Sequence, residues 1–325
     1  MVQQQGRFNY WSQLAILLGL VGAGIILASV VTVAIGLGAV GGNMAGAMKN
    51  AEAIQTALLK PENSGYAQAA QIAGTFFMMF LPSVAFILIC HKKMLWAGFS
   101  KHFNFLQVLV GFFIMLVANY LANPFEELTK MVLVHLPSID KAAKAAEDLY
   151  TQAVLSMSNL KGWGQFILAV FIVAFFPAVF EELLFRGVLQ NFIAKWSRLP
   201  VLAVIIASLL FSLVHASYYL FISRFILGLA LGFMFHYTKN IWVNIFAHFI
   251  NNLMALGVLF YGNLHNKAAT VNEQEIKLPI WSIVITGAII YGLFMLLVKV
   301  SRENRNRIGL QENLVFGNEP LIAQQ

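Results

Sequence analysis

Long apolar runs separated by short polar connections dominate the hydropathy pattern of this 325-residue chain. A membrane-spanning α-helix needs about 20 predominantly apolar residues. The pattern therefore predicts an all-α, polytopic integral membrane helix bundle with about eight transmembrane helices. The weakest boundary lies between the fifth and sixth runs, where Ala216–Tyr219 is the only polar interruption. The runs lie near residues 14–40, 71–90, 106–123, 163–190, 200–219, 221–238, 241–260 and 280–299.

The connections between these runs predict an organisation in five parts. Residues 141–155 are rich in helix formers, which favours a short helix outside the membrane. The sequence after Arg302 is polar, and we expect it to be disordered. The parts are N-terminal transmembrane helices in 1–123, an extramembrane loop with a short helix in 124–162, a core of four helices in 163–260, a loop and the last transmembrane helix in 261–299, and a polar cytoplasmic tail in 300–325.

Composition and charge support a membrane protein. The chain is 59% hydrophobic and 11% charged, with a mean hydropathy of +0.75, which is too apolar for an ordinary soluble domain. The short basic connections at 91–102 and 195–198 and the basic start of the tail place both termini in the cytoplasm by the positive-inside rule. The net charge of +7 includes no basic cluster interleaved with aromatics, which argues against a nucleic-acid partner. The first run is longer than a signal-peptide core and is read as an uncleaved anchor.

Two adjacent glutamates and an arginine interrupt the fourth apolar run. Glu182 and Arg186 are four residues apart and share a helix face, whereas Glu181 is turned about 100° away. An ion pair that joins helices would account for Glu182 and Arg186. Glu181 is then left as a free acid or base, and Pro177, one turn earlier, opens room for water beside it.

Polar residues also interrupt two later runs. His215 alone is more often a satisfied interior histidine than a functional one. His248 and Asn252 lie one turn apart on one helix face, where two hydrogen-bond donors suit a developing oxyanion. Arg224, at the start of the sixth helix, is either a boundary residue that reaches the membrane surface or a partner for a buried acid. The remaining histidines fall in connections or at boundaries and are read as solvated.

Three motifs appear in a fixed order in these apolar helices: EExxxR at Glu181, Glu182 and Arg186, FxxxH at Phe211 and His215, and HxxxN at His248 and Asn252. This order closely resembles the CPBP intramembrane proteases, the family of CAAX proteases and bacteriocin-processing enzymes. The resemblance covers roughly residues 163–258. One motif alone would be weak, but three in the right order and spacing on membrane helices are specific.

The resemblance implies an intramembrane endopeptidase with a polar catalytic cavity open toward the cytosol. Glu181 would act as the general base, aided by His215, while His248 and Asn252 would stabilise the oxyanion. Glu182 and Arg186 would support this site. The expected partners are a peptide or protein substrate at the membrane and the lipid bilayer, and the expected location is the inner membrane of a bacterium.

Metal use is open in the family that the sequence resembles. Zinc has been assigned to its glutamate and histidine side chains, and a metal-free glutamate mechanism has also been described. The chain has no HExxH signature, and Glu181, His215 and His248 with a water could hold Zn²⁺.

Two other classes of protein remain as alternatives. A non-catalytic membrane scaffold of the same fold would be free to lose Glu181 or His248, yet every motif position is intact. A small proton-coupled transporter could relay protons through these groups, but it gives the pairing of His248 with Asn252 no special role.

Overall fold

The computed structural model describes residues 7–41, 51–157, 162–264 and 278–316 of the chain. Every regular element in these ranges is a helix, and no strand occurs among them. Seven helical segments are long and apolar enough to cross a membrane, and an eighth apolar helix, Pro200–Val214, is shorter. These findings confirm the predicted all-α bundle of about eight transmembrane helices.

The membrane-spanning segments include two that combine several helices in one unbroken stretch. In chain order the spans are α1 (Tyr10–Ala39), Pro61–Cys90 with α4 (Ser64–Thr75) and α5 (Leu81–Cys90), α6 (Phe105–Leu133), Trp163–Ser197 with α8 (Trp163–Ala169), α9 (Phe176–Glu182) and α10 (Asn191–Ser197), α12 (Phe221–Thr238), α13 (Ile241–Leu264) and α14 (Ser282–Phe316). The other helices are α3 (Ala51–Leu58), α7 (Pro137–Met157) and α11 (Pro200–Val214).

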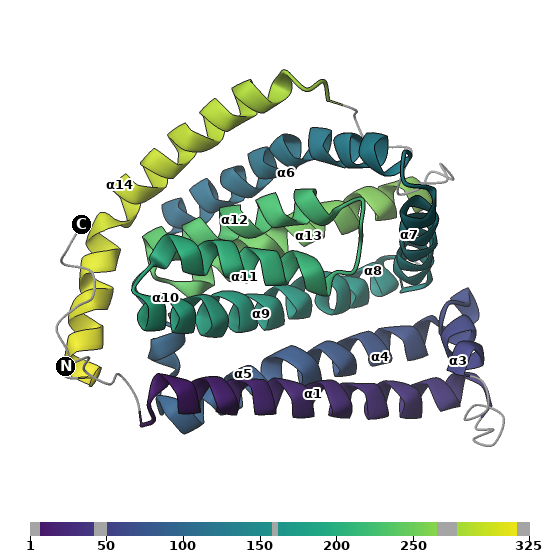
Figure 1. Cartoon of the computed structure of the whole chain (residues 1–325), viewed down its shortest axis with the longest axis horizontal. Coiled ribbons are helices and arrows are strands. Elements are labelled where there is room, and N and C mark those ends of the chain that lie inside the picture. Colours follow the sequence, from purple (N-terminus) through teal and green to yellow (C-terminus); the bar gives the residue numbers. More distant parts are fainter. Residues whose placement is uncertain (1–6, 42–50, 158–161, 265–277, 317–325) are drawn as a thin grey trace.

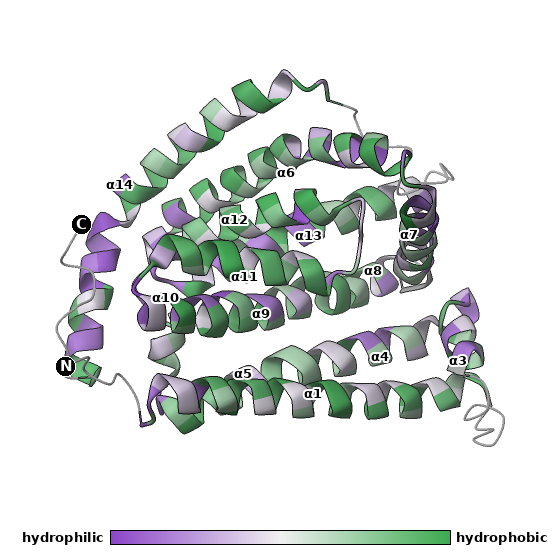
Figure 2. Cartoon of the chain, viewed as in Figure 1, coloured by the Kyte–Doolittle hydropathy of each residue, from purple (hydrophilic) through white to green (hydrophobic). Residues whose placement is uncertain are grey.

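The helices form two packed regions and two outer elements (Figure 1). α1 packs along α4 and α5 in one layer. α6, α9, α11 and α13 form the second region, a core with α12 at its centre. α14 crosses the outside of α6 and α12, and α7 stands across one end of the bundle. Hydrophobic residues cover the long helices, whereas α7 and the last part of α14 are largely hydrophilic (Figure 2).

The region between the third and fourth spans differs from the prediction. α6 continues past the expected end at residue 123 to Leu133, with Pro124 buried inside the helix. α7 has 21 residues and is not the short helix expected within 124–162. A hydropathy pattern predicts the end of a helix where the apolar residues end. The helix itself continues as long as its backbone hydrogen bonds and packing contacts are made. Ala122 and Glu126, on either side of the proline, are also buried, so packing offsets the hydrogen bond that Pro124 lacks.

The expected disorder of the tail after Arg302 is wrong for the residues that the structure describes. α14 stays helical to Phe316. The side chain of Gln107, at the start of α6, donates to Ser301 Oγ at 2.9 Å and accepts from Asn304 at 2.8 Å. Ile308 is fully buried. The tail helix exposes one polar face, and its other face packs against the bundle.

His91 contradicts the prediction that histidines outside the motifs are solvated. Its side chain is buried and stacks on Trp96 with a centroid separation of 3.8 Å. Burial, followed by the charge of Lys195, lowers the pKa of His91 to about 3. His91 is therefore a neutral packing residue. His265, another of this group, lies outside the described residues.

Candidate functional site

The glutamate pair lies between two widened turns of the fourth span. π-helical segments occupy Val170–Phe175 and Leu183–Gln190, on either side of α9. Pro177 follows the first of them, and its ring and missing N–H are better accommodated next to a wider turn than in a regular α-helix. Single π turns inside α-helices are frequent at functional sites. This local structure sets the direction of both glutamate side chains.

Glu182 and Arg186 form an ion pair inside the bundle. Arg186 Nη1 lies 2.7 Å from Glu182 Oε1, and the two residues are 1% and 0% exposed. Arg186 Nη2 also donates to the backbone carbonyl of Gly228 on α12 at 3.2 Å, and the guanidinium lies over the Phe211 ring on α11. The predicted pairing of one carboxylate with the guanidinium is confirmed. The arginine thereby joins three helices.

The carboxylate of Glu182 also holds two side chains of α13. His248 Nδ1 lies 2.9 Å from Oε1, and Asn244 Nδ2 donates to Oε2 at 3.1 Å. Because an ionised carboxylate only accepts hydrogen bonds, Nδ1 of His248 carries the hydrogen. The other ring nitrogen, Nε2, is then directed away from Glu182.

Glu181 faces the Nε2 atoms of both histidines. Glu181 Oε2 lies 3.8 Å from Nε2 of His248 and 4.0 Å from Nε2 of His215. These distances are too long for direct hydrogen bonds. They suit one water oxygen that lies about 2.8 Å from each group. The Glu181 side chain is 12% exposed, so it is less enclosed than Glu182.

His215 sits where α11 stops. Its Nδ1 lies 2.7 Å from the carbonyl oxygen of Phe211, which assigns the hydrogen to Nδ1 and leaves Nε2 free to accept. Arg224 Nη1 donates to the His215 carbonyl at 3.1 Å, and only 9% of Arg224 is exposed. Arg224 is thus neither a surface-reaching boundary residue nor, in the contacts described, the partner of a buried acid. It binds the end of α11.

Asn252 is less closely tied to this group than its spacing suggested. It follows His248 by one turn of α13 and is half-buried. Among the described residues it has no hydrogen-bond partner. The structure therefore brings together Glu181, His215 and His248, while Asn252 lies on the same helix with a free amide.

Asn244 is a site residue that the sequence analysis missed. It is fully buried and donates both to Glu182 and to the Leu231 carbonyl at 2.7 Å. Its side chain fixes the carboxylate that fixes His248. The signal was available, because Asn244 precedes His248 by four residues, the same spacing that drew attention to Asn252.

The described residues contain no group of three histidine, cysteine, aspartate or glutamate side chains arranged to hold a metal ion. Glu181, His215 and His248 are the donors that zinc favours, but two ligands about 2.1 Å from one tetrahedral zinc lie roughly 3.4 Å apart. The separations of 3.8 and 4.0 Å are wider. The described arrangement does not fit a bound zinc.

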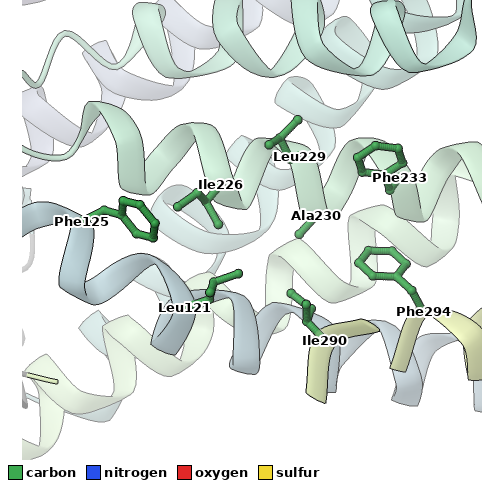
Figure 3. A pocket seen from close by; sticks show the side chains of 8 residues that line it. All are labelled: Leu121, Phe125, Ile226, Leu229, Ala230, Phe233, Ile290 and Phe294. Atoms are coloured by element: carbon green, nitrogen blue, oxygen red, sulfur yellow. The ribbon is translucent and has the colours of Figure 1, made fainter. Parts of the chain in front are cut away.

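A cavity of about 260 Å³ lies between α6, α12 and α14. Its lining is entirely apolar, and it contains none of the residues discussed above, so it offers no groups for catalysis. The lining side chains, drawn in Figure 3, are Leu121, Phe125, Ile226, Leu229, Ala230, Phe233, Ile290 and Phe294.

Comparison with known proteins identifies the segment that carries this site. Residues 163–254 match the model of the family described as type II CAAX prenyl endopeptidase Rce1-like. Over 74 residues the chain is 40% identical to the uncharacterized protein YpbD of Bacillus subtilis (strain 168), a stretch that covers 22% of this chain and about a third (34%) of that protein. No solved structure matches the chain. The segment that matches this family model holds the glutamate pair, Arg186, both site histidines, Asn244 and Asn252.

Proposed function

We propose that this protein is an intramembrane endopeptidase that hydrolyses peptide bonds with a water molecule activated by Glu181. The observation that carries the proposal is the convergence of Glu181 Oε2 with the two histidine Nε2 atoms, at 3.8 and 4.0 Å. The family assignment of residues 163–254 supports a protease of the CAAX type.

The hydrogen-bond directions suggest how the water is held. One water hydrogen points to Glu181 and the other to the unprotonated Nε2 of His215, which leaves an oxygen lone pair for the substrate. Glu181 takes the first proton as the water oxygen bonds to the carbonyl carbon. It then returns this proton to the leaving amine as the C–N bond breaks, so the enzyme ends in its starting state.

The carbonyl oxygen of the substrate gains negative charge in this step. Nε2 is the ring nitrogen of His248 left to interact with this oxygen, because its Nδ1–H is already engaged by Glu182. The Asn252 amide provides a donor one turn away. Donors aimed at the developing oxyanion lower the barrier most when they are fixed before the reaction. The buried contacts of Glu182 with Arg186 and Asn244 provide this fixation.

The proposed substrate is a peptide or protein segment at the membrane surface. We place both termini in the cytoplasm of a bacterial cell, with the protein in the inner membrane. The charge pattern of the connections supports this orientation. Tyr10 and Phe316 pack against the same core cluster, which is consistent with both ends of the described chain lying at one face of the bundle.

Cleavage of a quenched-fluorescence peptide library by the purified protein in liposomes tests the proposal. We expect Glu181→Gln and His248→Ala to lower the rate at least about 100-fold, the usual size of a general acid–base contribution. Glu52→Gln, a change at an exposed glutamate of α3, is the matched control and should cleave at the wild-type rate. The chelator 1,10-phenanthroline should leave the rate unchanged, because the three donors are too widely spaced for a zinc.

Equal cleavage by folded wild type and Glu181→Gln would contradict the proposal and favour a non-catalytic scaffold. Loss of activity with the chelator, restored by added Zn²⁺, would instead replace the metal-free mechanism with one in which the same side chains bind zinc.

A further inference from the structure

The chain that follows His215 is a short irregular connection between α11 and α12. α11 ends at Val214, and Ala216 adopts a left-handed backbone with φ of 50°. An alanine pays a steric cost in this conformation that a glycine would not. A connection of this kind leaves the direction of the His215 side chain dependent on the contacts around it.

α7 supplies three of these contacts from one of its faces. Asp140 Oδ1 accepts from the Tyr219 hydroxyl at 2.5 Å, and Glu147 Oε2 accepts from Ser217 Oγ at 2.7 Å. Tyr150 lies under the guanidinium of Arg224, 4.8 Å from its ring centroid. Residues 140, 147 and 150 repeat with helical spacing and therefore share a face of α7.

The partners of α7 lead directly to His215. Ser217 Oγ, which donates to Glu147, also accepts from the Leu220 N–H at 3.2 Å and so closes the turn that follows the histidine. Arg224, which Tyr150 covers, donates to the His215 carbonyl. Ser217 and Tyr219 are 5% and 6% exposed, so these contacts lie inside the protein and not at a loose surface.

The charges at the first contact favour the same arrangement. The Tyr219 hydroxyl, followed by the ammonium of Lys144, lowers the pKa of Asp140, and burial raises the pKa of Tyr219 to about 12. A carboxyl whose pKa is lowered on folding stabilises the folded protein at pH values above its unfolded pKa of about 4. This stabilisation is lost as the pH falls through the lower pKa of the folded state. At neutral pH the carboxylate is therefore an acceptor and the phenol a donor.

We propose that α7 is a positioning element for His215, which acts through Ser217, Tyr219 and Arg224 to hold the end of α11 in register with Glu181. The inference rests on the proposed function of His215. α7 lies outside the segment 163–254 that matches the family model, so this control of the histidine is added to the family's core by another part of the chain.

Truncation of two α7 contacts tests the inference. In the peptide-cleavage assay, the double variant Glu147→Ala with Tyr150→Ala should lower kcat about tenfold and leave KM within twofold, because a misplaced His215 affects the reacting water and not substrate binding. Asp148→Ala removes a neighbouring exposed carboxylate and should match wild type. Glu147→Gln keeps an acceptor for Ser217 and should retain most of the activity.

A double-mutant cycle separates positioning from general destabilisation. In a His215→Ala background the same double variant should cause no further loss of kcat, because the side chain that α7 positions is absent. An equal tenfold loss in both backgrounds would overturn the inference.

Hydrogen–deuterium exchange of residues 213–222 provides a readout that does not need activity. We expect faster exchange in the double variant and wild-type exchange in Asp148→Ala. Unchanged exchange in the double variant would overturn the inference, whether or not a peptide is cleaved. If wild type cleaves no peptide while exchange responds as expected, the proposed function fails and α7 is shown to hold this connection for another purpose.

Discussion

The N-terminal layer and the core of the bundle are held together by different means. In the most apolar 18-residue stretch of α1, 17% of the residues are buried. In the corresponding stretch of Trp163–Ser197 the share is 50%. Where α1 is buried it is closely packed, since a Cβ at Gly24 would lie 2.4 Å from the Phe77 carbonyl oxygen. The core instead buries a connected set of polar groups around Glu182. In a membrane, where apolar contacts with lipid and protein are similar, close packing and internal hydrogen bonds are the two remaining means of association.

Removal of one charge from the core should have the largest effect. Arg186→Leu leaves Glu182 buried without its cation, which costs about 3–5 kcal/mol of folding free energy. We expect a large fall in the thermal denaturation midpoint in detergent. The double variant Glu182→Leu with Arg186→Leu should recover part of the loss, because neither charge is then left unpaired. Equal midpoints for the single and double variants would show that the pair is not what stabilises the core.

A clash in the N-terminal layer should have a smaller effect and should spare the site. Gly24→Ala places a methyl group against the Phe77 carbonyl and 2.7 Å from Pro82 Cγ, so α1 must move away, at a cost of about 1–3 kcal/mol. The denaturation midpoint should fall while peptide cleavage per folded molecule stays at the wild-type value. Gly22→Ala is the matched control, since nothing lies within 4 Å of its added methyl group. A loss of cleavage in Gly24→Ala would mean that the two regions are coupled.

Asn244 offers the finest test of the polar network. Asn244→Ala removes one of the donors to Glu182 and should lower kcat about tenfold, with KM unchanged, because His248 is oriented through that carboxylate. The control is Asn251→Ala on the same helix, whose amide bonds Asn119 and not the glutamate. Wild-type kcat in Asn244→Ala would show that Arg186 alone is sufficient to orient Glu182.

Much of the fold could be predicted from hydropathy because the membrane imposes a length on each helix. The same reasoning did not predict where α6 and α14 end, since both continue into regions where packing and not the membrane decides. For α14 the pattern was present: Leu297, Ser301 and Ile308 are buried and recur at helical spacing through a sequence that is polar on average. A window average conceals a one-sided pattern of this kind.

The candidate site shows a similar division. The spacing of Glu182 and Arg186 predicted their ion pair, because four residues on a helix leave little freedom. The approach of Glu181 to His215 and His248 depends on how three helices pack, which no local spacing determines. Arg224 was undecided for the same reason, because its partner is a backbone carbonyl, a group that every residue carries and no sequence pattern marks.

The π-helical segments have a consequence for insertions and deletions. A residue added to or removed from a helix rotates everything beyond it by about 100°, and a π turn holds one residue more than an α turn would. Loss of a single residue between Val170 and Phe175 would let that segment become a regular α turn and would leave Glu181 facing the histidines. Loss of Ala178 from the regular helix α9 would instead turn Glu181 by about 100° relative to the earlier part of the span, with every side chain of the motifs still present. The helical register of this span, as well as the identity of its residues, therefore determines whether the site forms.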